Sequence, residues 1–143
     1  MKLRRNGLAS ARTTSGEEVV GTRDVLRVPG REIRWEDILA ADWDSETGVL
    51  TVSLVEPEVL TYELVDPALL LQLVRERVTA SVVLSRRVPL ADGGGFTLMA
   101  RRAPGGGEVA FTCEYDREVD PDAPDVVESA RAAVRAARDD LGL

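Results

Sequence analysis

The sequence has no histidine and a single cysteine, Cys113. Because Ser–His and Cys–His catalytic sites and histidine-containing zinc sites need imidazole, the first absence excludes all of them. A lone cysteine cannot form a disulfide within the chain, which is typical of a reducing compartment. Cys113 alternates with Phe111 and Tyr115 on one face of a predicted strand. We therefore interpret it as a buried structural residue and not as a nucleophile.

Long apolar runs are also absent, and Lys2 is the only lysine. No segment approaches the roughly 18 consecutive apolar residues of a membrane helix. Residues 6–15 are too polar to form the apolar part of a signal peptide. We therefore predict a cytoplasmic protein without stable membrane insertion. The preference for arginine, with abundant alanine, valine and glycine, is typical of a GC-rich bacterial genome.

The net charge of −7 argues against nucleic acid as a partner, because phosphate binding needs a basic surface. The charges occur in blocks. Residues 1–34 carry eight bases and four acids, and residues 35–66 carry nine acids and no base. Residues 67–104 carry six arginines and two acids, and residues 105–143 carry ten acids and four arginines. The blocks either neutralise one another within the fold or present a bipolar surface, and the sequence leaves both possibilities open.

The length of 143 residues predicts a single domain, with sub-lobes at 8–79 and 80–143. In the first, short β-branched and aliphatic runs separated by turn residues predict five or six antiparallel strands. The seven runs, from which we count five or six strands, lie at 8–13, 19–22, 25–28, 33–35, 38–43, 49–55 and 60–65. Asp66 and Pro67 are a helix-start signal, with the aspartate as the cap, and apolar residues at helical spacing predict a helix over 67–78.

The second sub-lobe is predicted to contain three strands and a helix. The strands lie near 81–90, 95–102 and 108–115, and two glycine runs form the tips of the hairpins between them. The helix follows a segment rich in proline and aspartate and ends near Leu141. Its apolar side is expected to consist of Val126, Val127, Ala130, Ala133, Val134, Ala137 and Leu141. The fold class is therefore α+β: a partly open antiparallel barrel closed by a helix, then a three-stranded extension and a C-terminal helix.

The segments 19–28, 33–38 and 49–52 together resemble bacterial pleckstrin-homology-like (PH-like) and GRAM-like domains. The whole chain also resembles an uncharacterised family of small actinobacterial proteins. The resemblance covers about residues 8–79. It implies a capped barrel that binds proteins, peptides or, in some members, lipid head groups. Members that bind phosphoinositides cluster basic residues around the first hairpin, whereas this chain has Glu17 and Glu18 there.

Two acidic groups are candidate metal sites. The segment 42–48 has acids at alternate positions, but its glycine comes one residue late for a calcium loop, and Ser53 stands where the bidentate glutamate belongs. A solvated hairpin is the better interpretation. The aspartates of the second group are more simply explained as capping the last helix than as holding a cation. They are Asp116, Asp120, Asp122 and Asp125. We predict no metal and no cofactor.

The arginines of the third charge block are the candidate site. They are Arg75, Arg77, Arg86, Arg87, Arg101 and Arg102. Strand alternation sends one member of each adjacent pair outward, so several guanidinium groups can share a face and meet a carboxylate or a phosphate. The alternatives are pairing with the acidic block 35–66 and simple solvation. Trp35 and Trp43 are expected in the core, with an interface patch as the other possibility.

The functional prediction is a non-enzymatic protein-binding or scaffold module that binds a protein partner or another copy of itself. The alternative is a module that binds a small anionic ligand or a membrane head group. An enzyme comes third, because no set of residues supplies a nucleophile, a base and an orienting group.

Overall fold

The computed structural model describes residues 7–143, which form two compact units. The first contains the described residues up to Ser81, together with Arg102–Glu108. The second contains Val82–Arg101 and Val109–Leu143. The observed change at Ser81 lies close to the sub-lobe boundary expected after residue 79. Segment 102–108, expected with the second sub-lobe, belongs to the first unit.

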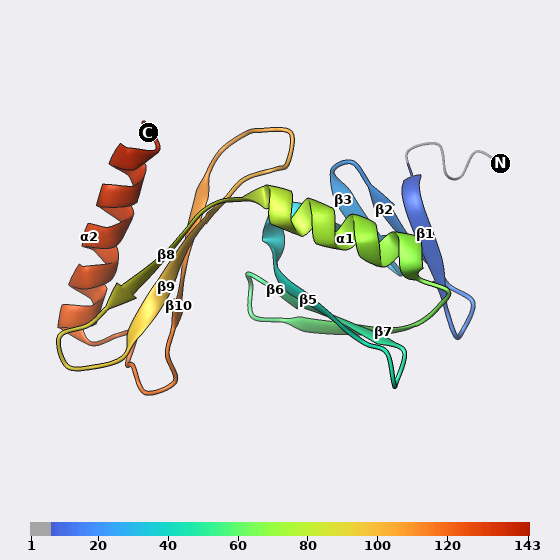
Figure 1. Cartoon of the computed structure of the whole chain (residues 1–143), viewed down its shortest axis with the longest axis horizontal. Coiled ribbons are helices and arrows are strands. Elements are labelled where there is room, and N and C mark those ends of the chain that lie inside the picture. The colour runs from blue at the N-terminus through green and yellow to red at the C-terminus, as the bar shows by residue number, and fades with distance from the viewer. Residues whose placement is uncertain (1–6) are drawn as a thin grey trace. The chain divides into compact units, whose positions relative to one another are not determined.

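The first unit is built on a seven-stranded antiparallel sheet (Figure 1). The strands are β1 Gly7–Thr13, β2 Glu18–Thr22, β3 Val25–Val28, β4 Arg31–Arg34, β5 Ile38–Asp44, β6 Val49–Leu54 and β7 Val59–Val65. Their order is β4-β3-β2-β1-β7-β6-β5. Strands β1 to β4 lie side by side in sequence order, as do β5 to β7, and the two groups meet where β1 pairs with β7. The edges of the sheet are β4 and β5. The β1–β7 pairing joins Arg12 to Val65 and Thr13 to Leu64.

The predicted strand count of five or six was too low. The difficult strand is β4, which has four residues and only one buried side chain, Ile33. So short an edge strand shows almost no alternation. Trp35, expected at the end of this strand, instead lies in a short 3-10 helix, η1, Trp35–Asp37. There it is fully buried, and its Nε1 donates to the Thr22 carbonyl at 3.0 Å.

Helix α1, Ala68–Ser81, covers the core of the first unit (Figure 1). Leu70 and Val74 on this helix are buried against the alternating inward side chains of the strands. The helix runs three residues beyond the predicted end at 78, because residues 79–81 contain no glycine or proline to stop it. Asp66 precedes the helix with a positive φ of 48°, and within residues 7–143 its side chain makes no capping hydrogen bond, contrary to our expectation.

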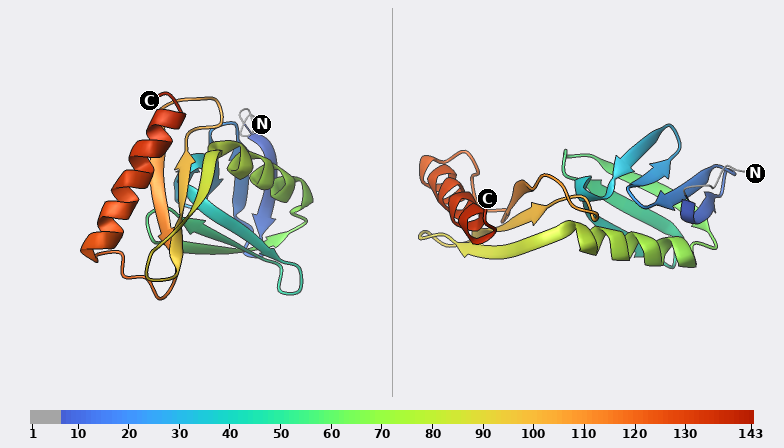
Figure 2. Two further views of the ribbon diagram at one scale, coloured as in Figure 1. Left: turned by 60° about the vertical axis from the view of Figure 1, so that its left-hand side comes forward. Right: turned by 90° about the horizontal axis from the view of Figure 1, so that it is seen from above.

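The second unit contains the predicted three-stranded antiparallel sheet and C-terminal helix (Figure 2). The elements are β8 Val82–Pro89, β9 Gly95–Arg101, β10 Ala110–Tyr115 and α2 Pro124–Asp140. The central strand is β9. Phe96 and Leu98 of β9 are fully buried and cluster with Ala137 of α2. The α+β class is confirmed.

Candidate functional site

Side chains of both acidic segments accept hydrogen bonds from backbone amides. Within residues 7–143, no three acid or cysteine side chains are grouped so that they could hold a metal ion. Segment 44–48 is the predicted hairpin connection: Asp44 Oδ1 accepts hydrogen bonds from the Glu46 and Thr47 amides at 2.9 and 3.3 Å. These backbone bonds hold the pKa of Asp44 below its usual value. Gly48 supplies the left-handed residue, with φ of 71°.

The aspartates before α2 have separate roles. Asp116 binds Arg87 and the Gly95 amide, and Asp120 accepts a hydrogen bond from the Asp122 amide at 3.0 Å. The residue at the helix N-cap is Ala123, which has no side-chain cap. Only Asp125 lies in the first turn of α2, where it faces the positive end of the helix dipole. None of the four caps α2 by a side-chain hydrogen bond, contrary to our expectation, and Asp125 alone lies where its charge is favoured by the helix dipole.

Cys113 is half-buried on β10, packed against the core of the second unit. Burial raises the pKa of its thiol, and a hydrogen bond with Tyr115 offsets this only in part. A raised pKa lowers the thiolate fraction at neutral pH, which is the opposite of what a nucleophilic cysteine needs.

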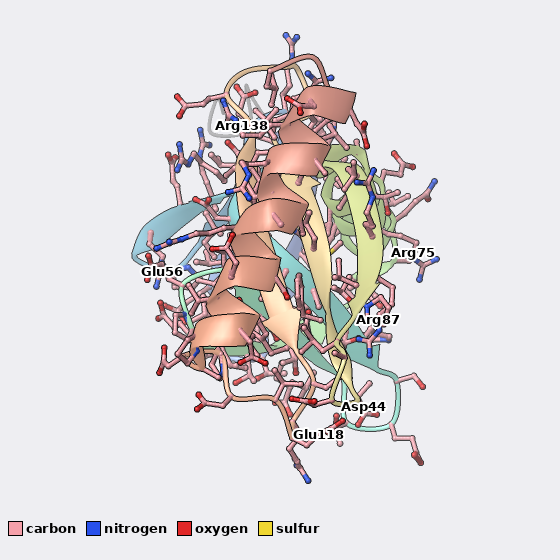
Figure 3. The ribbon with its side chains drawn as sticks, turned by 90° about the vertical axis from the view of Figure 1, so that its left-hand side faces the viewer. Asp44, Glu56, Arg75, Arg87, Glu118 and Arg138 are labelled. Carbon is pink, nitrogen blue, oxygen red and sulfur yellow. The ribbon has the colours of Figure 1, made fainter. Side chains whose placement is uncertain are left out.

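Arg86 and Arg87 form ion pairs within the second unit. Arg86 reaches Asp140 of α2 at 2.9 Å, and Arg87, labelled in Figure 3, reaches Asp116 at 2.6 Å. Arg86 lies opposite Leu98 in the β8–β9 register, on the face that packs against α2, and Arg87 lies on the other face. Their partners belong to the acidic block 105–143, not to the block 35–66 considered from the sequence.

The other four candidate arginines are spread over the fold. Arg101 ends β9 and is almost fully buried at 2% exposure, and burial lowers the pKa of its guanidinium. Arg102 is exposed just after that strand. Arg77 is half-buried on α1, whereas Arg75 is exposed on the same helix and projects outward (Figure 3). Within either unit, the structure does not gather the six into one cationic face.

Ion pairs also join the first two charge blocks. Arg31 binds Glu58 at 2.9 Å, and Arg34 binds Asp37 at 3.1 Å. In these two pairs, bases of block 1–34 meet acids of block 35–66. In the Arg86 and Arg87 pairs, bases of block 67–104 meet acids of block 105–143. The block pattern therefore reflects internal neutralisation at least in part. The pairs of Arg31, Arg34 and Arg86 are solvent-exposed and contribute little to stability, whereas Asp116, the partner of Arg87, is partly buried.

The two sheets have four edge strands, which differ in how they are protected. Charged side chains and proline on an edge discourage pairing with another chain. Three of the four residues of β4 are charged, and β8 carries two arginines and Pro89. By contrast, β5 and β10 contain no proline and no basic residue. These two strands are the sheet edges best suited to accept another strand.

A groove lies beside β5, between this strand and α1. It measures about 230 Å³. Its walls are mostly apolar, with a single charged residue, Arg75, at the rim. The lining residues are Ala41, Trp43, Leu50, Leu71, Val74, Arg75, Val78 and Thr79. Only one of the six candidate arginines thus lines this groove.

The outer face of β5 is acidic. Asp42 and Asp44 are exposed, whereas the alternating residues Ala41 and Trp43 are half-buried and pack against the core cluster under α1. Strand alternation accounts for these two faces. It does not by itself place Trp43 at a groove, because that depends on where α1 lies.

None of the three comparisons with known proteins gave a match: no family model, no curated protein and no solved structure. None of the helices in residues 7–143 is both long enough and apolar enough to cross a membrane.

Proposed function

We propose that this chain is a non-enzymatic protein-binding module that receives an extended segment of a partner protein along β5. The observation that carries the proposal is an edge strand without proline or basic residues, charged only at Asp42 and Asp44, beside an apolar groove. Both features are needed, because a sheet edge supplies main-chain hydrogen bonds and a neighbouring groove supplies selectivity.

The main-chain part of the interaction follows from the sheet order. Among the described residues, β5 pairs with β6 alone. In an antiparallel ladder, alternate residues direct their N–H and C=O groups away from the partner strand. A segment lying along Ala40–Asp44 can complete these bonds and become the eighth strand of the sheet.

The side chains of the bound segment should alternate. On one face they meet the groove beside Trp43, Val74 and Val78, which favours apolar residues. On the other face they lie next to Asp42 and Asp44, where cross-strand pairing favours lysine or arginine. Arg75 at the rim of the groove favours a carboxylate at one position of the segment or at its C-terminus.

The element order supports a PH-like or GRAM-like assignment for the first unit. Two antiparallel meanders, β1–β4 and β5–β7, which meet at the β1–β7 pair and are followed by a covering helix, agree with the partly open, capped barrel that the resemblance implies. An actinobacterial origin and a cytoplasmic location remain part of this proposal, supported by the arginine-rich composition and the unpaired, half-buried Cys113.

The test is selection from a displayed library of random short peptides against the full chain, followed by affinity measurement on the enriched peptides. We expect sequences in which apolar and basic residues alternate and in which one position or the C-terminus supplies a carboxylate to Arg75. Arg75→Glu should weaken their binding by about tenfold. Arg102→Glu is the matched control, because it makes the same charge change at an exposed arginine of the same unit.

Thr79→Trp is the second variant, since it fills the groove from an exposed position and leaves the core untouched. It should abolish binding while the far-ultraviolet circular dichroism is unchanged. Enrichment of no peptide, together with salt-sensitive binding to vesicles of anionic phospholipid, would replace the proposal with the head-group alternative. Equal loss in Arg75→Glu and Arg102→Glu would move the site away from the groove.

A further inference from the structure

We propose that β10 and the adjoining flank of α2 form an interface with a second copy of this chain, related by a two-fold axis perpendicular to the three-stranded sheet. This surface lies entirely within the second unit and is independent of the peptide groove on the first. In the dimer, the two β10 strands pair antiparallel and the two sheets become one of six strands.

The β10 edge has little that would keep another strand from pairing with it. Its sequence, Ala110–Tyr115, contains no proline and one charged residue, Glu114. The opposite edge of the same sheet, β8, has Arg86, Arg87 and Pro89. Such residues are the usual means by which an edge strand is kept from pairing. Of the two edges of this sheet, only β10 lacks that protection.

An apolar hollow lies on the β10 side of α2. It measures about 440 Å³, and apart from two arginines its lining is largely apolar. The lining residues are Tyr115, Val127, Ala130, Arg131, Val134 and Arg135. The flank of α2 toward β8 differs, because there the Arg86–Asp140 ion pair joins the helix to its strand. Apolar surface is therefore available beside β10, where a second copy would cover it.

Charge complementarity along α2 selects a second copy of this chain as the occupant. Glu128 lies two turns before Arg135, and the two side chains approach to 3.6 Å while both remain about two-thirds exposed. A two-fold axis perpendicular to the sheet reverses any direction lying in it, so the two α2 helices run antiparallel. Glu128 of each copy then faces Arg135 of the other, and Arg131, midway between them on the same flank, meets its own counterpart near the axis. The alanines of α2 are small enough for two antiparallel helices to approach closely.

The first experiment measures molar mass by light scattering as a function of protein concentration for the full chain and two variants. The wild type should pass from monomer to dimer. Glu128→Arg and Arg135→Glu should each weaken self-association by about tenfold or more, because each places like charges opposite one another. Arg117→Glu, an exposed arginine outside α2, is the control and should dimerise as the wild type does.

Mixing the two variants separates the interface from any effect within one chain. Chains with two arginines at these positions then face chains with two glutamates, so the mixture should recover the wild-type dimer. Loss of the ion pair within each helix cannot produce this rescue. A mixture as monomeric as its components would overturn the proposed helix contact, and so would a wild type that stays monomeric at all concentrations.

Amide hydrogen exchange locates the strand contact. Exchange in Ala110–Tyr115 should slow as the wild type dimerises and should remain fast in Arg135→Glu at the same concentration. A dimer whose exchange in this segment matches that of the monomer would place the interface elsewhere and overturn the proposal. Arg75→Glu should dimerise normally, so failure of the peptide groove and failure of this interface are distinguishable.

Discussion

Arg87 and Asp116 form a two-bond fork in which Nη1 donates to Oδ1 at 2.8 Å and Nη2 donates to Oδ2 at 2.6 Å. Asp116 Oδ2 also accepts the Gly95 amide at 2.9 Å. One carboxylate therefore ties together β8, the first residue of β9 and the loop that follows β10. Charge-assisted bonds of this geometry are stronger than ordinary hydrogen bonds and fix orientation as well.

The Asp116 fork should make stability depend on pH. The bonds from Arg87, and to a lesser extent from Gly95, hold the pKa of Asp116 below its unfolded value of about 3.9. Its contribution is therefore complete above that unfolded value and is lost as the pH falls through the lower folded-state pKa. Asp116→Asn should lower the urea midpoint at pH 7, and its difference from the wild type should vanish in strong acid.

Asp92→Asn is the control for this prediction, because Asp92 is an exposed carboxylate in the neighbouring hairpin tip. It should leave the urea midpoint nearly unchanged at every pH. A difference between Asp116→Asn and wild type that persists undiminished in acid would mean that the carboxylate charge is not what holds these three segments.

Two glycines should differ in their tolerance of alanine. A Cβ at Gly95 would collide with the Val88 carbonyl oxygen and lie 3.1 Å from Pro89 Cα, both backbone atoms that cannot turn aside. A Cβ at Gly21 would meet the tip of the Leu73 side chain at 2.5 Å, which can rotate. Gly95→Ala should lower the free energy of unfolding by about 3 kcal/mol and Gly21→Ala by about 1 kcal/mol. Chemical denaturation measures both, and a reversed order would contradict the packing of β8 on β9.

The two single-tryptophan variants, Trp35→Phe and Trp43→Phe, should differ in stability and in the quenching of the tryptophan that remains. Trp35→Phe removes the Nε1 donor to the buried Thr22 carbonyl and should lower the free energy of unfolding by about 1–3 kcal/mol. Trp43→Phe should cost less than this, because Trp43 is only half-buried. In acrylamide quenching, the remaining Trp43 should be accessible and the remaining Trp35 protected. Equal quenching of the two would contradict the position of Trp43 at the groove.

The sequence predicted most of the fold because its turn residues are unambiguous. Gly48 and the glycines of the second unit mark hairpins, and Pro124 opens the last helix as expected. The errors fall where local signals are weak. The four-residue β4 has one buried side chain, and Trp35 lies in a 3-10 turn that no periodicity marks.

The candidate sites were harder to predict because they depend on tertiary neighbours. Arginine pairs in the sequence suggested a shared cationic face, yet Arg86 and Arg87 point to opposite sides of β8 and each has its own carboxylate. Nothing local in the sequence indicates that Trp43 lies next to α1 or that Tyr115 lies next to Val134. Edge strands are likewise a property of sheet order, which hydrophobic patterning does not specify.

Segment 102–108 belongs to the first unit, and this limits how the gene can be divided by recombination. The chain passes between the units after Ser81, after Arg101 and after Glu108, so neither unit is one continuous stretch of sequence. A gene fragment ending at Ser81 encodes the seven strands and α1 but omits the returning loop, and a fragment starting at Val82 carries that loop without its neighbours. Recombination that moves either unit alone separates segment 102–108 from the unit to which it belongs, so natural fusions and duplications should carry the 7–143 region whole.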